Sequence, residues 1–198
     1  MEFETRAIHA GQPPDESTGS VNVPIYQTST YAQDGVGRLR GGHDYARTIN
    51  PTRTALEVCL ASLEEGSHGV AFASGMAAIS AVLELVRPGG RTVAINDVYG
   101  GTYRLFSKIV EPKGSRFEYA NLADRTEAER ALAEPAGLVW VESPTNPLLR
   151  IVDIRLLASL AHACGALLVV DNTFASPYLQ QPLTLGADVV VHSTTKYV

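Results

Sequence analysis

The feature that most constrains the fold is an alternation of short apolar runs, rich in β-branched residues, with segments of helical periodicity. Leu138–Glu142, Ala166–Val170 and Asp188–His192 are apolar runs of the kind that a parallel sheet buries on both faces. Ile154–Cys164 lies between two of these runs and has helical spacing. Parallel strands need a crossover connection, usually a helix. The alternation therefore predicts an α/β fold, with a mainly parallel sheet flanked by helices.

The same alternation extends towards the N-terminus and ends near residue 50. The expected strands there are Gly69–Ala73 and Thr92–Asn96, and the expected helices are Met76–Val86, Thr102–Val110 and one that starts at Asn50-Pro51 and stops before Gly66. Residues 11–42 are instead rich in Gly, Pro, Ser, Thr and Gln, which indicates an extended arm. We therefore predict an N-terminal arm over residues 1–50, which makes contacts between subunits, and a sheet domain over residues 51–198.

Composition excludes several classes of partner. The 198 residues carry a formal charge of -5 with scattered Lys and Arg, so no basic surface for nucleic acid is predicted. The first eleven residues have no continuous apolar stretch, so we expect no signal peptide, no membrane partner and a cytoplasmic location. Cys59 and Cys164 are far apart among apolar residues, as free thiols usually are.

Ligands of open parallel sheets bind beyond the carboxyl ends of the strands, so the polar residues there are the first functional candidates. The turn Ser74-Gly75-Met76 leads into a helix and would offer backbone N–H groups to an anion such as phosphate. An ordinary strand-to-helix turn, with Gly75 needed only for its backbone angles, has the same sequence pattern.

Two charged residues follow the later strands. Asp171 emerges from an apolar run and needs a partner, which a protonated pyridine nitrogen would supply; a helix cap or an ion pair is the alternative. Lys196 follows the hydroxyl residues 193–195 and can form an imine, although a solvated loop lysine is the simpler interpretation of that residue by itself. An anion cradle, a carboxylate and an imine-forming lysine together are what pyridoxal 5'-phosphate requires.

Six segments resemble the Cys/Met-metabolism (transsulfuration) family of fold-type I pyridoxal-phosphate enzymes. They are Asp44–Arg47 with Asn50–Arg53, Ala73–Ala78, Asp97–Arg104, Glu142–Pro147, Val170–Phe174 and His192–Tyr197. The resemblance covers nearly the whole chain. It implies the large domain of the type I fold, with pyridoxal 5'-phosphate as the cofactor.

The resemblance also implies a role for each matching residue. Lys196, which would hold the cofactor as a Schiff base, and Tyr99, which would stack on its ring, are the expected catalytic residues. The expected cofactor-binding residues are Tyr45, Arg47, Gly75, Met76, Tyr99, Asn146, Asp171, Ser193, Thr195 and Lys196. Among these, Asp171 matches the partner of the pyridine nitrogen and Asn146 a residue near the phenolic oxygen, whereas the backbone at residues 75 and 76 and the hydroxyls at 193 and 195 match the phosphate site.

Tyr45 and Arg47 match a pair that the family contributes to the phosphate of the neighbouring subunit. The resemblance therefore implies a homodimer with shared active sites, usually assembled into a tetramer. Family members are considerably longer than this chain. The resemblance implies that the rest of the large domain and a smaller C-terminal domain, which supplies the arginine for the substrate carboxylate, are absent here, so we expect this stretch to be inactive alone.

The implied reaction takes place at Cγ of an activated homoserine or of cystathionine. The first expectation is cystathionine γ-synthase activity, because Asp44 before Tyr45 and the stretch 100–104 look more like the bacterial enzymes of that kind. Cystathionine γ-lyase, O-acetylhomoserine sulfhydrylase and methionine γ-lyase activities are the alternatives; Gly101 stands where methionine γ-lyases commonly carry Cys. A non-catalytic relative that keeps the fold is the alternative from another class.

The sequence lacks the signatures of two further classes of protein. A dinucleotide-binding dehydrogenase would carry a Gly-x-Gly-x-x-Gly turn after its first strand, and the sequence has none. The five histidines show no paired ligand spacing, so no metal site is predicted.

Overall fold

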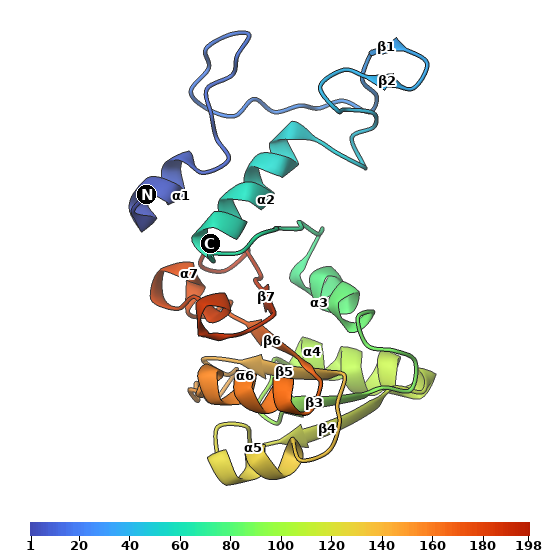
Figure 1. Ribbon diagram of the computed structural model, residues 1–198, viewed down its shortest axis with the longest axis vertical. Helices are drawn as coiled ribbons and strands as arrows, with labels where there is room; N and C mark the ends of the chain where they lie inside the picture. The colour runs from blue at the N-terminus through green and yellow to red at the C-terminus, as the bar shows by residue number, and fades with distance from the viewer. The chain divides into compact units, whose positions relative to one another are not determined.

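A five-stranded parallel sheet organises the residues from Phe72 to Val198, one of the two compact units into which the chain divides; the other is Met1–Ala71 (Figure 1). The computed structural model describes all 198 residues. The strands are β3 (Arg91–Ile95), β4 (Arg116–Ala120), β5 (Leu138–Glu142), β6 (Leu167–Asp171) and β7 (Val189–Val191). They lie in the order β4-β3-β5-β6-β7, and every neighbouring pair is parallel. This confirms the predicted α/β class.

Helices accompany these strands, and those that follow β3 connect them, as parallel pairing requires. They are α3 (Gly75–Leu83), α4 (Gly100–Arg104) with a π-helical continuation over Leu105–Val110, α5 (Arg125–Ala131), α6 (Ile154–Ala163) and α7 (Ser176–Leu179). Short 3-10 turns cover Glu111–Lys113 and Pro182–Leu185. Helices α5 and α6 pack side by side, and α3 contacts α4. Because β3→β4 and β4→β5 run in opposite directions across the sheet, the right-handed crossovers usual for parallel strands would place α4 on one face and α5 and α6 on the other.

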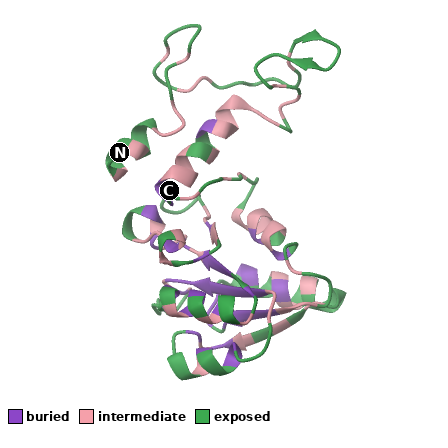
Figure 2. Cartoon of the chain, viewed as in Figure 1, coloured by how far each residue is buried: buried purple, intermediate pink, exposed green.

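The core includes residues of both faces of the sheet, and the central strands are largely buried, drawn purple in Figure 2. Every residue of β5 is buried, which explains the unbroken apolar run in its sequence. Trp140 and Phe106 are fully buried and meet edge to face, with ring centroids 5.6 Å apart. Burying a side chain of the size of Phe contributes about 2–3 kcal/mol, so this cluster fixes the π-helical segment against the sheet.

The first unit consists of two helices and a long connection between them. Its elements are α1 (Phe3–His9), the two-stranded antiparallel β1 (Gln33–Gly35) and β2 (Arg38–Leu39), and α2 (Pro51–Leu63). The Asn50 side chain caps α2 by accepting from the N–H groups of Thr52 (2.9 Å) and Arg53 (3.4 Å). It also donates to the Tyr26 carbonyl oxygen at 2.9 Å, so one residue starts the helix and anchors the preceding arm.

One expected strand is absent. Gly69–Ala73 has no strand partner, so that prediction is wrong. The Ala71 N–H donates instead to a Glu57 carboxylate oxygen at 2.9 Å, and a Cβ at Gly69 would lie only 2.3 Å from the Glu57 carbonyl oxygen. The segment therefore packs along α2 rather than pairing with a strand. The predicted division after residue 50 concerns function and stays a prediction.

Both cysteines are free, and no helix of the chain combines the length and the apolar character that a membrane span requires.

Candidate functional site

The candidate site lies at the carboxyl edge of the sheet. From β3 the chain first adds β4 on one side and then returns to the other side of β3 to form β5. The loops that leave β3 and β5 therefore diverge at a topological switch point, where open α/β sheets bind their ligands. The loop after β3 carries Tyr99, the loop after β5 carries Asn146, and Asp171 ends β6 next to β5. The structure thus gathers three of the predicted site residues at this edge.

A chain of hydrogen bonds links β6 to the segment after β7. One Asp171 oxygen accepts from the Thr173 hydroxyl at 2.5 Å and from the Thr173 N–H at 3.0 Å. The Thr173 hydroxyl oxygen in turn accepts from the Ser193 N–H at 2.9 Å. Sequence reasoning missed Thr173 as a site residue, because only the structure shows that its hydroxyl joins two predicted residues.

Asp171 ends its strand in a half-buried position, and desolvation is the main reason why its pKa is raised. The hydrogen bonds from Thr173 and the nearby His192 oppose that rise. A carboxylate in such surroundings is held by fixed donors and favours a cationic partner, because the low dielectric strengthens their attraction.

Gly75 brings the start of α3 against the segment after β7. A Cβ at Gly75 would lie 3.2 Å from the Ser193 Cβ, a contact that leaves very little room. The φ angle of Gly75 is not in the left-handed region, so this glycine is needed for close approach rather than for its backbone angles. Ser74 caps the helix by accepting from the Ala77 N–H at 3.1 Å. The first N–H groups of α3 and the Ser193 hydroxyl therefore lie together, an arrangement suited to an anion.

Lys196 follows this region. Its backbone N–H donates to the Ser193 carbonyl oxygen at 3.1 Å, which forms a turn over residues 193–196. Lys196 and Thr195 are exposed, and Ser193 is half-buried. A primary amine and two hydroxyl residues thus lie within one turn of the β7 carboxyl end, close in sequence to the residues that Asp171 reaches through Thr173.

Tyr99 lies over a glycine next to Met76. A Cβ at Gly101 would lie 2.4 Å from Cε1 of the Tyr99 ring and 3.1 Å from the Met76 sulfur. The missing side chain at position 101 therefore determines where the ring lies. The ring remains 45% exposed, so a face is available to a planar ligand.

Glu142 is the second site residue that sequence reasoning missed. Both of its carboxylate oxygens accept from the Tyr99 N–H, at 2.9 and 3.0 Å, and the Asn146 backbone also hydrogen-bonds to it. Burial raises its pKa from 4.5 to about 8, and the charges of Asp171 and Asp97 add to the rise. The only sequence signal for Glu142 was its position in the segment Glu142–Pro147, which resembles the family.

Asp97 supports the loop after β5. It accepts from the Thr145 hydroxyl and from the Leu148 N–H, the latter at 3.2 Å. The Thr145 hydroxyl oxygen accepts from the Arg150 N–H at 2.8 Å. These contacts fix the loop on both sides of the half-buried Asn146.

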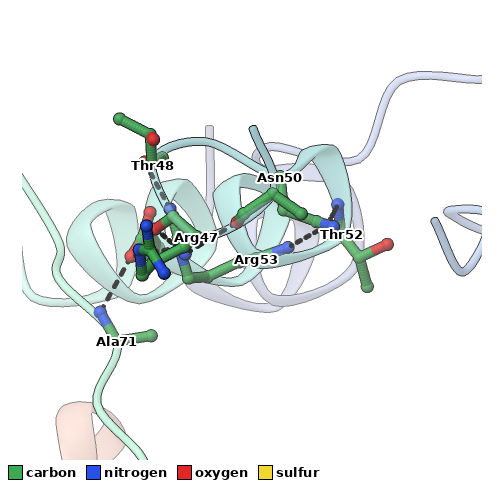
Figure 3. A network of polar contacts seen from close by, with 8 residues as sticks. Arg47, Thr48, Asn50, Thr52, Arg53 and Ala71 are labelled. Carbon is green, nitrogen blue, oxygen red and sulfur yellow. Dashed lines mark hydrogen bonds and ion pairs between the residues drawn. The ribbon is translucent and has the colours of Figure 1, made fainter. Parts of the chain in front are cut away.

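Tyr45 and Arg47 belong to the first unit and form a pair there. The Arg47 guanidinium lies 4.9 Å from the Tyr45 ring centroid. Arg53 holds the backbone of this loop by donating to the carbonyl oxygens of Ala46 (3.4 Å), Arg47 (3.1 Å) and Thr48 (2.7 Å), as Figure 3 shows in part. Because Arg53 bonds only to backbone oxygens of this loop, the exposed Arg47 side chain stays accessible to an anion.

Comparison with known proteins identifies the family of the chain. Residues 4–198 match the model of the family described as Cys/Met metabolism PLP-dependent enzyme. The chain is 56% identical over 195 residues to the cystathionine gamma-synthase of Mycobacterium tuberculosis, which covers 98% of this chain and 50% of that protein. It is 50% identical over 198 residues to the cystathionine gamma-lyase of Bacillus subtilis, covering 100% and 52% of the two chains.

The chain is also similar to a solved structure, in sequence and in fold. The crystal structure of metB from Corynebacterium glutamicum superposes with a TM-score of 0.97 at 48% identity and covers 100% of this chain and 51% of that one. The chain thus spans about half the length of the curated relatives it matches.

The contact between Gly101 and Tyr99 generates a first prediction. Gly101→Ala introduces a Cβ where the Tyr99 ring lies, and we expect the partly exposed ring to move while the fold persists. Gly100→Ala is the matched control, because its Cβ would meet only Arg104 Nη1 at an ordinary 3.5 Å. The measurement is the NMR signal of carbon-13-labelled tyrosine, assigned with Tyr99→Phe. An unmoved Tyr99 signal in Gly101→Ala would contradict the prediction.

Glu142 makes stability depend on pH. Its pKa rises from 4.5 to about 8 on folding, so the folded protein keeps a proton that the unfolded chain loses. Its contribution to the free energy of unfolding is fully present below pH 4.5 and falls as the pH rises towards about 8. At about 1.4 kcal/mol per pKa unit the upper bound is about 5 kcal/mol.

Glu142→Gln cannot ionise and removes this slope. Urea unfolding at several pH values should therefore show the variant gaining stability relative to the wild type as the pH rises through that window. A difference that stays constant with pH would show that Glu142 does not carry the proton.

Proposed function

Because the chain belongs to the Cys/Met metabolism family of pyridoxal-phosphate-dependent enzymes, we propose that it forms the cofactor-binding part of a transsulfuration enzyme that acts at Cγ of an amino-acid substrate. The observation that carries the proposal is that three kinds of group occur at the carboxyl edge of one sheet. These are the anion cradle of Gly75 and Ser193, the half-buried Asp171 carboxylate at the end of β6, and Lys196 in the turn that follows β7.

The residues at this edge fit the cofactor. The start of α3 and the hydroxyls of Ser193 and Thr195 would hold the phosphate, and Met76 would add its backbone N–H. Asp171, oriented by Thr173, would hold the pyridine nitrogen in its protonated form. Lys196 would attach the cofactor covalently. When bound, the cofactor supplies an electron sink for charge that develops at Cα of the substrate.

The remaining site residues would position ring and substrate. Tyr99 offers an aromatic face, and Asn146 offers an amide on the opposite loop of the switch point. Lys196 would also move protons, taking one from Cα of the substrate after its amine is released. We assign Lys196 to catalysis because its amine would both attach the cofactor and move the proton. We assign Tyr99 to catalysis because its ring would contact the cofactor.

We extend the proposal to a homodimer. The exposed Arg47 pairs with the half-buried Tyr45, and Arg53 fixes the backbone of this loop, which suits a phosphate contact in a neighbouring subunit. The cofactor site would then be shared between two chains, and the dimers would pair into a tetramer. The proposed location of the enzyme is the cytoplasm.

Among the family's activities we propose cystathionine γ-synthase, which joins an O-acyl-homoserine and cysteine. The support is the sequence similarity to a protein of that name and the residues Asp44 and 100–104. Cystathionine γ-lyase is the second candidate, since a protein of that name is 50% identical. The two reactions share the chemistry at Cα, so the proposed roles at this edge are the same for both.

The covalent role of Lys196 has a direct test. The chain has three lysines, Lys108, Lys113 and Lys196. We expect the purified protein with pyridoxal phosphate to show the absorbance band of covalently held cofactor, and Lys196→Ala to lose it because no other amine follows β7. Lys113→Ala, a change at an exposed lysine, is the matched control and should keep the band. An unaltered band in Lys196→Ala would overturn the assignment.

The choice between synthase and lyase is tested with substrates. We expect the complete enzyme, of which this chain would form the cofactor-binding part, to form cystathionine from an O-acyl-homoserine and cysteine with a kcat/KM at least about tenfold above that for cysteine release from cystathionine, a difference of about 1.4 kcal/mol in transition-state stabilisation. The reverse order of the two values would favour the lyase.

A further inference from the structure

Glu142 lies at the carboxyl end of the central strand, but it has no role in the proposed function. It is the last residue of β5, its exposed fraction is 3%, and β5 lies between β3 and β6 in the sheet. Glu142 pairs in register with Asp171 on β6. Paired residues of neighbouring parallel strands project to the same face. The two carboxyl groups are therefore neighbours at the edge where we place the cofactor.

The hydrogen bonds of Glu142 join both loops of the switch point. Its two oxygens accept from the Tyr99 N–H, which lies at the start of α4, and the Asn146 backbone hydrogen-bonds to the same carboxyl group. One buried side chain thus fixes the backbone of the two residues that we expect to contact the cofactor ring from different loops. A displaced backbone at residue 99 would move the aromatic ring with it.

The surroundings of Glu142 favour its neutral form. The charged groups that face it are Asp97 from the loop after β3 and Asp171 from β6, and His192 acts on Asp171. Asp97 and Asp171 each have a hydroxyl donor, from Thr145 and Thr173 respectively. Glu142 accepts from backbone N–H groups in a more enclosed position. Two neighbouring carboxylates do not both ionise readily. Asp171 has the Thr173 hydroxyl and N–H as donors and His192 nearby, and these groups lower its pKa and so favour its charged form.

We propose that Glu142 is a positioning residue of the cofactor site, which holds the Tyr99 and Asn146 segments through their backbone N–H groups and, as a neutral acid, leaves Asp171 as the single carboxylate of the pair. This inference rests on the proposed function. It assigns the negative charge that meets the pyridine nitrogen to one residue, and it couples the geometry of the ring contacts to a side chain that need not touch the cofactor.

Two variants separate the parts of this proposal. Glu142→Gln keeps a neutral acceptor of the same size, and we expect it to bind pyridoxal phosphate within about threefold of the wild type. Glu142→Ala removes the acceptor, and we expect affinity to fall by about tenfold or more, because the N–H groups that hold the Tyr99 and Asn146 segments lose their partner. Glu64→Gln is the matched control: the same change at a residue with 5% exposure in the first unit.

The circular dichroism of the bound cofactor at saturation distinguishes positioning from general stability. We expect its shape to change in Glu142→Ala and to be restored in Glu142→Gln. An Ala variant with wild-type affinity and spectrum would overturn the positioning role. A Gln variant as impaired as the Ala variant would overturn the neutral form, because the charge would then be needed.

Infrared spectroscopy tests the proton without activity and without the Ala variant, should that variant fail to fold. The wild type at neutral pH should show the stretch of a protonated carboxylic acid that Glu142→Gln lacks. Its absence would overturn the neutral form. If the wild type binds no pyridoxal phosphate, the proposed function fails, and the infrared band still decides whether Glu142 holds a proton.

Discussion

The common direction of the five strands is the constraint on which the candidate site depends. Both faces of this sheet are covered, so a polar group placed along a strand would be buried without water. In the buried central strands β5 and β6, charged residues therefore occur only at the strand end. Because all strands point the same way, their polar endings gather at one edge. The reversal between β4 and β5 opens this edge between two loops, which gives a ligand room between Tyr99 and Asn146.

Burial at this edge has an electrostatic consequence. Desolvation is the largest cause of the raised pKa of both Glu142 and Asp171, so the sheet itself disfavours negative charge there. Each carboxyl group that stays at the edge has donors that oppose this cost: Thr173 for Asp171, Thr145 and the Leu148 N–H for Asp97, and the Tyr99 N–H for Glu142. The hydrogen bonds that offset the desolvation of these carboxyl groups therefore also fix the loops that supply the donors. A cation placed beside Asp171 would then meet a carboxylate that needs no reorientation.

Much of the fold was predictable from sequence because burial on both faces produces an unbroken apolar run. Leu138–Glu142 was predicted with its observed bounds, and β3, β6 and β7 within one or two residues. Strand β4 was not predicted, because it lies at the edge of the sheet, where residues 116–119 alternate between exposed and half-buried positions and only Ala120 is buried. The false strand at Gly69–Ala73 shows the opposite error. Its composition suits a strand, but a strand also needs a partner, and this segment uses its hydrogen bonds on α2.

The candidate site was predictable only as far as strand endings reveal it. Asp171, Asn146 and Ser193 follow apolar runs, so their convergence followed from the topology. The contacts of Thr173 and Glu142 depend on which loop faces which, and no spacing in one sequence contains that information. Glycine illustrates the same limit. The turn before α3 suggested that Gly75 supplies unusual backbone angles, whereas the structure shows an ordinary φ and a close approach to Ser193. Gly101 likewise leaves room for the Tyr99 ring. At both positions the neighbour in space, not the local turn, excludes a side chain, so substitutions there act first on the geometry of the site.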